Sequence, residues 1–166
     1  MRYKRKAAEM LGYQLKNRRK AIIFVLGSKV WSSVWFDWKR GMKYMEEFIK
    51  QYWNCIASQD EEELKKYFHR HACIRWHNTN EQFNVPEFLR ANCDYPGNWN
   101  GEVERIEQIG YTHITVTHVW SNEISFHVTS FIVIKNGKIE VLDEYWGDDG
   151  VAPQWRQDKH IGRPIV

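Results

Sequence analysis

The sequence lacks most of the local signatures that identify a cofactor or a catalytic class. It contains no Gly-rich phosphate loop and no nucleophile elbow. Its three cysteines, Cys55, Cys73 and Cys93, form no CxxC pair and have no nearby histidines at zinc-ligand spacing. We therefore expect reduced thiols in a cytoplasmic protein, with no structural metal and no cofactor.

Two local groups of metal-binding residue types do not change this expectation. His69 and His71 lie two residues apart, but no third ligand is evident nearby. The acidic turn over residues 147–150 lacks the spaced oxygen ligands of a calcium loop. An exposed acidic turn is the simpler interpretation.

Long apolar runs are also missing. Residues 21–26 are apolar, but Gly27, Ser28 and Lys29 interrupt them, and no small-residue cleavage site follows. A membrane-spanning helix needs about 20 apolar residues, and a signal peptide needs an unbroken apolar core. The sequence predicts neither.

Charge is unevenly distributed along the chain. Residues 1–44 hold 12 of the 24 Lys and Arg residues but only two acidic ones, Glu9 and Asp37. We expect a basic N-terminal extension over residues 1–44, one domain over residues 45–150 and a C-terminal tail over residues 151–166. Nucleic-acid or membrane-surface contact is confined to the extension, whose basic and aromatic residues suit either partner. Alternatively, the extension lies upstream of a natural start at Met45.

Helices are predicted in the first part of the domain. A helix is expected over residues 45–58, where apolar side chains recur every three or four residues: Met45, Phe48, Ile49, Tyr52 and Ile56. Asp60 is a candidate N-cap for a second helix that reaches about residue 69. A third is expected over residues 85–92, with Pro86 in its first turn.

Alternating polar and apolar residues predict strands over residues 71–78, 101–110, 111–121, 125–134 and 138–146. For the strand over residues 101–110, the alternation does not decide which face points inward. In the next strand, the apolar set assigned to the inner face is Ile114, Val116 and Trp120, with His118 among them. The residues assigned to the outer face of the sheet are His113, Thr115 and Thr117 from this strand, and Phe131 and Val133 from the strand over residues 125–134. Helices followed by an antiparallel meander predict an α+β fold, with helices packed on one face of a curved sheet.

The last predicted strand carries the strongest candidate for chemistry. Glu144 and Trp146 share one of its faces, and Asp143 and Tyr145 share the other. Each face therefore combines a carboxylate with an aromatic ring, and an apolar environment raises the pKa of a carboxylate. The residues alone leave open which face points inward.

Two segments, IKQYWNCIASQD and GKIEVLDEYW, make residues 45–150 resemble the nuclear transport factor 2-like superfamily. This is a cone-shaped α+β fold that includes ketosteroid isomerase and the SnoaL-like polyketide cyclases. The resemblance places Tyr52 at the isomerases' hydrogen-bond-donating tyrosine. It places Trp76 and Ser130 at their two catalytic carboxylates, so steroid isomerisation by the family mechanism is not expected. Trp146 falls on a pocket-lining position, which implies that Glu144 also faces inward.

The resemblance and the aromatic content together predict a small-molecule pocket. The chain has nine Trp and is 15% aromatic, which suggests a lined cavity or a large interface. We expect an apolar ligand, aromatic or polycyclic. If the protein is an enzyme, we expect isomerase- or lyase-type proton transfer, with Glu144 as acid or base and Tyr52 stabilising an oxyanion. The predicted ligand-binding residues are Trp76, Asn78, Phe88, Trp99, His118, Trp120, Ser130, Leu142 and Trp146.

The alternative is a non-catalytic interaction module whose aromatic residues fill the core. In that case the outer sheet face forms a homodimer, His118 is a core histidine and Glu144 is a paired carboxylate. The cavity itself discriminates between the two interpretations. If Tyr52, Glu144 and Trp146 do not converge on a void of at least a few hundred Å³, the usual scale of ligand pockets, the pocket interpretation fails.

Overall fold

A computed structural model describes residues 29–165 of the chain, with side chains from residue 41 onward. The chain divides into two units, Met1–Met42 and Lys43–Val166, and the second carries the fold and the candidate site. Of the expected basic extension, residues 1–28 lie outside the described part. None of the helices in the described part has the length and apolar character needed to cross a membrane.

The first described helix, α2 (Lys29–Ser58), begins well before the expected start at Met45. Gly41 lies in its interior, where a glycine costs only about 1 kcal/mol relative to alanine and does not by itself end a helix. In its C-terminal half, Ile49, Tyr52 and Ile56 are buried at helical spacing, as the periodicity predicts.

Two short helices follow, and both are capped as expected. α3 (Glu61–Lys65) begins after Asp60, whose side chain accepts a hydrogen bond from the backbone of Glu63. It ends before the predicted residue 69, because Phe68 already pairs with Ile139 in the sheet. α4 (Val85–Cys93) begins with a complete capping box formed by Asn84 and Glu87.

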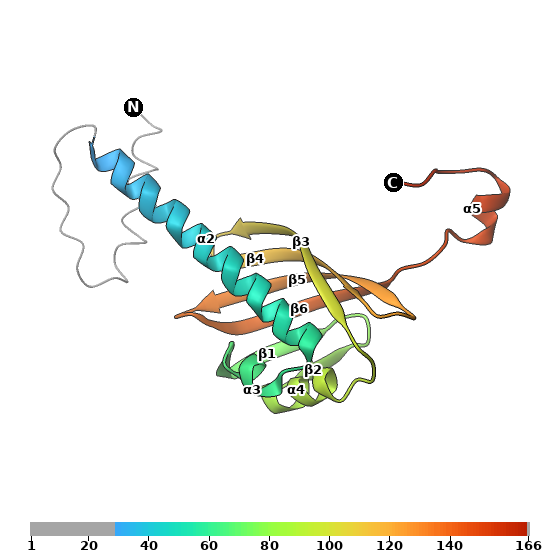
Figure 1. Ribbon diagram of the computed structural model, residues 1–166, viewed down its shortest axis with the longest axis horizontal. Helices are drawn as coiled ribbons and strands as arrows, with labels where there is room; N and C mark the ends of the chain where they lie inside the picture. The colour runs from blue at the N-terminus through green and yellow to red at the C-terminus, as the bar shows by residue number, and fades with distance from the viewer. Residues whose placement is uncertain (1–28, 166) are drawn as a thin grey trace. The chain divides into compact units, whose positions relative to one another are not determined.

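Six strands form one sheet in the order β2-β1-β6-β5-β4-β3. Their bounds are β1 (Phe68–Trp76), β2 (Glu81–Phe83), β3 (Asn100–Ile109), β4 (Thr112–Trp120), β5 (Ser125–Lys135) and β6 (Lys138–Asp148). β1 and β6 pair in parallel and the other neighbours are antiparallel. The C-terminal half of α2 lies across one face of the sheet, and α3 and α4 lie beside β1 and β2 (Figure 1). The α+β prediction is confirmed.

The inner face of the sheet is more polar than the sequence predicts. On β4 the buried residues are His113, Thr115, Thr117 and Val119. The register explains this pattern, because Thr115 lies opposite Ser130 and residues directly opposite each other share a face. The assignment of His113, Thr115 and Thr117 to the outer face was therefore wrong.

The outer face carries the other half of β4. Ile114, Val116, His118 and Trp120 are only partly buried there. The inward assignment of His118 and Trp120 was wrong, because hydrophobicity alone does not decide which face of a strand meets the helices. The outward assignment of Phe131 is confirmed by its exposure.

The last described element is α5 (Gln154–Asp158), a short helix in the segment expected as a C-terminal tail. No described residue of this segment after Gly150 is buried.

Candidate ligand-binding site

A cavity of about 310 Å³ lies between the C-terminal end of α2, α4 and the inner face of the sheet. Its walls are largely apolar, and five of the lining side chains are aromatic: Trp76, Tyr95, Trp99, Phe126 and Trp146. Two other depressions, one beside α4 and β2 and one at the turn between β4 and β5, are more open to solvent. The aromatic cavity is therefore the best-formed candidate site.

The indoles of Trp76 and Trp146 form one corner of the cavity. Their ring centroids lie 6.3 Å apart in an edge-to-face arrangement. Trp146 also packs edge-on against Phe126 and against Trp53, which is buried on α2. Trp76 has Phe83 and Phe88 against its other sides. Each ring of the corner is thus held by others, and the corner does not depend on a ligand for its shape.

Glu144 lies directly behind this corner and is only 1% exposed. Its Oε2 accepts hydrogen bonds from Trp76 Nε1 at 2.7 Å and from Trp146 Nε1 at 3.2 Å. Its Oε1 accepts a third from Ser130 Oγ at 3.2 Å. One carboxyl group therefore fixes the orientation of two cavity-lining indoles.

The sheet register brings these groups together. Glu144 on β6 lies opposite Ser130 on β5 on one side and opposite Trp76 on β1 on the other. All three side chains therefore point to the same inner face. Burial raises the pKa of Glu144 to about 7, although the three hydrogen bonds act to lower it.

No protein-family model matches the sequence, and no curated protein matches it. Solved structures do match. An NTF-2 like protein of unknown function from Burkholderia xenovorans LB400 is 21% identical, with a TM-score of 0.62, over 75% of this chain and 98% of that chain. A candidate ketosteroid isomerase from Kribbella flavida DSM 17836 is 18% identical, with a TM-score of 0.58, over 69% of this chain and 84% of that chain. A candidate SnoaL-like polyketide cyclase from Shewanella putrefaciens CN-32 is 9% identical, with a TM-score of 0.51, over 61% of this chain and 88% of that chain.

The chain has the nuclear transport factor 2-like fold. At these identities the matches establish the fold and leave the activity open, because one fold hosts many functions. The site of this NTF2-like chain therefore has to be interpreted from its own residues.

Four of the predicted ligand-binding residues line the cavity: Trp76, Asn78, Trp99 and Trp146. Three others lie behind its walls. Ser130 contacts Glu144, Phe88 packs against Trp76, and Leu142 is fully buried in the core. His118 and Trp120 lie on the opposite face of the sheet and do not contribute.

The two predicted catalytic residues do not line the cavity. Glu144 is behind the indoles, and Tyr52 is fully buried among the rings of Trp53, Tyr67 and Phe68. The Tyr52 hydroxyl has no hydrogen-bond partner among the described residues. Burial, and then the nearby Glu144, raise the pKa of Tyr52. Of the trio Tyr52, Glu144 and Trp146, only Trp146 lines the cavity. The shared void on which the pocket prediction depended is therefore not found among the described residues, and the prediction fails in that form. A ligand site has to be argued from the different cavity beside Trp76 and Trp146.

Sequence reasoning missed several polar residues that line the cavity. Gln59 has a φ of 56° and donates hydrogen bonds to the carbonyls of Asn92 and Tyr95, which holds the segment after α4 in place. Asp148 lies at the end of β6 and is exposed, as expected for the acidic turn over residues 147–150, but it also lines the cavity. The alternation of side chains along β6 could have predicted that Asp148 is on the cavity side, since Asp148 follows Glu144 and Trp146 at a spacing of two.

Asn78 has a structural role as well as a lining one. Its Oδ1 accepts a hydrogen bond from the backbone N–H of Trp146 at 2.8 Å. This bond ties the segment after β1 to β6 beside the Trp76–Trp146 corner. The Asn78 amide N–H groups remain available at the edge of the cavity.

The outer face of β6 reinforces the same corner. Asp143 accepts two hydrogen bonds from Arg75, at 2.6 Å and 2.8 Å, and contacts His77 Nε2 at 2.7 Å. Partial burial acts to raise the pKa of Asp143, but these contacts hold it below its usual value. Tyr145 stacks on His77 at 4.4 Å. The outward facing of Asp143 and Tyr145 is as predicted.

The raised pKa of Glu144 makes stability depend on pH in a defined direction. The folded chain holds this proton between about pH 4.5 and about pH 7, a range in which the unfolded chain releases it. Protonated Glu144 therefore makes its full contribution to the free energy of unfolding below about pH 4.5. This free energy falls by about 3 kcal/mol as the pH rises from about 4.5 to about 7.

Urea unfolding of the wild type and of Glu144→Gln across this pH range would measure the effect. We expect the difference between the two free energies of unfolding to change by about that amount, because glutamine cannot ionise. A constant difference would show that Glu144 has an ordinary pKa.

Proposed function

We propose that the chain binds a small, largely apolar aromatic molecule in the cavity. The observation that carries this proposal is the pair of indoles, from Trp76 and Trp146, which Glu144 holds in fixed orientations at the cavity wall. Pre-formed, mostly apolar cavities with a few polar groups are typical ligand sites, and their volumes begin at about 300 Å³.

The volume of the cavity sets how much of a ligand it can enclose. A dry protein cavity of about 150 Å³ binds benzene. The cavity here is about 310 Å³ and therefore suits two or three fused rings better than the four rings of a steroid. Asn78 and Asp148 at its edge suit one polar substituent, such as a hydroxyl or a carbonyl group.

Calorimetric titration with a graded ligand panel would test this proposal. The panel contains a naphthol, a phenanthrol, a four-ring steroid and cyclohexanol. We expect the two- and three-ring aromatic compounds to bind at least about tenfold more tightly than the others, a difference of about 1.4 kcal/mol. Absence of binding by every compound would contradict the proposal.

Proton-transfer catalysis on the same ligand is a second candidate function, of the isomerisation, cyclisation or dehydration type. The pKa of Glu144, about 7, favours it, because that value suits an acid or base near neutrality. Its three hydrogen bonds and its place behind the indoles favour a positioning role instead. Glu144→Gln separates the two roles. We expect it to retain ligand binding, and loss of turnover with retained binding would assign Glu144 to catalysis.

A homodimer through the outer sheet face remains our proposal for a partner. That face presents Ile114, Val116 and Phe131 as partly exposed apolar residues, with Tyr145 beside them. Because the cavity is on the other face, the two proposals are compatible. In sedimentation velocity, we expect Phe131→Asp to convert a dimer into a monomer without loss of ligand binding. A wild-type monomer would contradict the dimer.

A further inference from the structure

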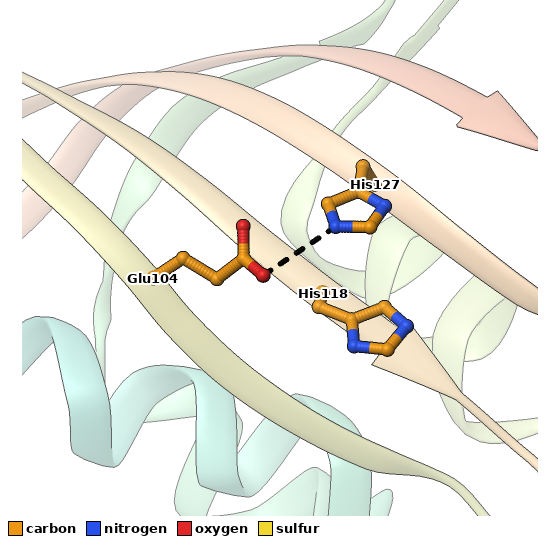
Figure 2. A group of neighbouring side chains, drawn as sticks. All are labelled: Glu104, His118 and His127. Carbon is orange, nitrogen blue, oxygen red and sulfur yellow. Dashed lines mark ion pairs between the residues drawn. The ribbon is translucent and has the colours of Figure 1, made fainter. Parts of the chain in front are cut away.

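Three neighbouring strands bring metal-binding side chains together on the outer face of the sheet. Glu104 comes from β3, His118 from β4 and His127 from β5, and the three side chains converge (Figure 2). One ligand atom from each lies within 4.8 Å of the other two. This cluster is on the opposite face of the sheet from the aromatic cavity, and none of its three residues lines that cavity.

The backbone places each member of the cluster. His118 and His127 are directly opposite each other in the β4–β5 pair, and their rings stack at 4.7 Å. Glu104 sits at a bulge, because Val103 and Arg105 pair with the adjacent residues Thr117 and Val116. A bulge of this kind re-aims a side chain, and here it directs a carboxylate towards the two imidazoles.

A further carboxylate, that of Asp149, lies next to both histidines. His127 Nδ1 contacts Asp149 Oδ1 at 2.6 Å, and His118 Nε2 lies 3.5 Å from Asp149 Oδ2. Ser125 Oγ donates a hydrogen bond to the same carboxylate at 2.6 Å. For His127, an imidazole that donates Nδ1–H to this carboxylate presents Nε2 as a ligand, which is the usual support of a metal-binding histidine; His118 is near the same carboxylate but forms no hydrogen bond with it.

We propose that Glu104, His118 and His127 bind a divalent transition-metal ion, with Zn²⁺ as the best-suited ion. Two imidazoles and one carboxylate form a known zinc ligand set that leaves a fourth position for water. Ligand atoms in a tetrahedral site with bonds of about 2.0–2.1 Å lie about 3.3 Å apart. His127 Nε2 is already 3.5 Å from Glu104 Oε1. The two imidazole planes are nearly parallel, at 9°, so their nitrogens do not point at one position, and binding requires one ring to turn. His127 is exposed and can make that movement.

In the isolated chain, solvent reaches the cluster at His118. A surface depression at the turn between β4 and β5 is lined by His118, Asp149 and Trp120. This opening gives an ion and its waters access to the cluster. The indole of Trp120 stacks on His118 at 4.6 Å and limits the movement of that ring.

The competing explanation is a set of ion pairs without a metal. The hydrogen bond to Asp149 raises the pKa of His127, and a protonated His127 would lie between Asp149 and Glu104. The sequence did not indicate either arrangement, since the residues are separated along the chain and the bulge cannot be seen in the residue order. The experiment must therefore distinguish a metal ligand from an ion-pair partner.

Calorimetric titration of the untagged full chain with ZnCl₂, after treatment with a chelator, tests the proposal. We expect one Zn²⁺ per chain. His118→Ala and Glu104→Gln should each weaken its affinity by more than tenfold, and Asp149→Asn by about 10- to 100-fold. The matched control is the double variant His69→Ala/His71→Ala, which removes an exposed histidine pair whose rings lie 5.8 Å apart on β1. Its affinity for Zn²⁺ should equal that of the wild type.

Two readouts keep the proposal falsifiable if one variant folds poorly. At one fixed concentration, Zn²⁺ should raise the Tm of the wild type and of the control more than that of Glu104→Gln, which keeps the size of the side chain. Co²⁺ should give visible absorption bands only where the cluster is intact. The proposal is overturned if the wild type binds no Zn²⁺, or if His118→Ala and Glu104→Gln both bind Zn²⁺ as tightly as the wild type does.

Discussion

Glu144→Ala should lower the free energy of unfolding by about 3 kcal/mol at pH 5, where the wild-type carboxyl is protonated. The variant removes the acceptor of two indole N–H groups and the partner of Ser130, and a buried donor without an acceptor costs about 1–3 kcal/mol. Ligand affinity should fall as well, because the rings of Trp76 and Trp146 lose their common anchor. Urea unfolding and calorimetric titration measure the two effects.

The pair Glu144→Gln and Glu140→Ala provides the controls. In Glu144→Gln, the amide oxygen accepts from both indoles and the amide nitrogen donates to Ser130 Oγ, so stability at pH 5 should stay within about 1 kcal/mol of the wild type. Glu140 is on the same strand and pairs at the surface with Lys135, which is worth about 1 kcal/mol or less. Equal losses in Glu144→Ala and Glu144→Gln would mean that the hydrogen bonds do not hold the corner.

Trp146→Ala is expected to have the largest effect on binding, a loss of at least about 100-fold, or about 2.7 kcal/mol. The ring lines the cavity and supports Trp53, Trp76 and Phe126. Its removal opens the cavity into the core, and Trp→Ala changes at such positions cost about 3 kcal/mol or more in stability. Titration with the best ligand of the aromatic panel gives the affinity, and thermal unfolding gives the stability.

The matched control is Tyr145→Ala, one residue earlier on β6. Tyr145 points to the outer face, where it stacks on His77 and is 45% exposed. Its removal should leave ligand affinity unchanged. If Tyr145→Ala weakens binding as much as Trp146→Ala does, the effect comes from the strand as a whole and not from the cavity wall.

The strand β6 shows what the sequence could predict. Its alternation gave two possible faces, and the superfamily resemblance selected the one that places Glu144 and Trp146 inside. The sequence could not predict whether the Glu144 side chain lines the cavity or is buried behind its wall. A carboxylate on the inner face can point into a cavity or be enclosed behind other side chains, and the indoles of Trp76 and Trp146 decide this only in three dimensions.

The strand β4 shows where the same reasoning fails. Its apolar residues, Ile114 and Val116, suggested the inner face, but Thr115 and Thr117 are the buried ones. The register with β5 overrides local hydrophobicity, because Ser130 is inside and Thr115 lies opposite it. The same inversion moved His118 to the outer face, next to His127 and Glu104. The candidate metal cluster was therefore invisible until the register was known.

The most direct test of the proposed cavity is the response of the tryptophan indole N–H signals in a ¹H–¹⁵N NMR titration with a two- or three-ring aromatic ligand. Trp76, Trp99 and Trp146 line the cavity, whereas Trp120 is on the outer face and Trp155 is 59% exposed on α5. We expect the signals of the first three to shift and saturate together, and those of Trp120 and Trp155 to stay in place. Shifts confined to Trp120 or Trp155, with Trp76 and Trp146 unchanged, would contradict the proposal that this cavity is the ligand site.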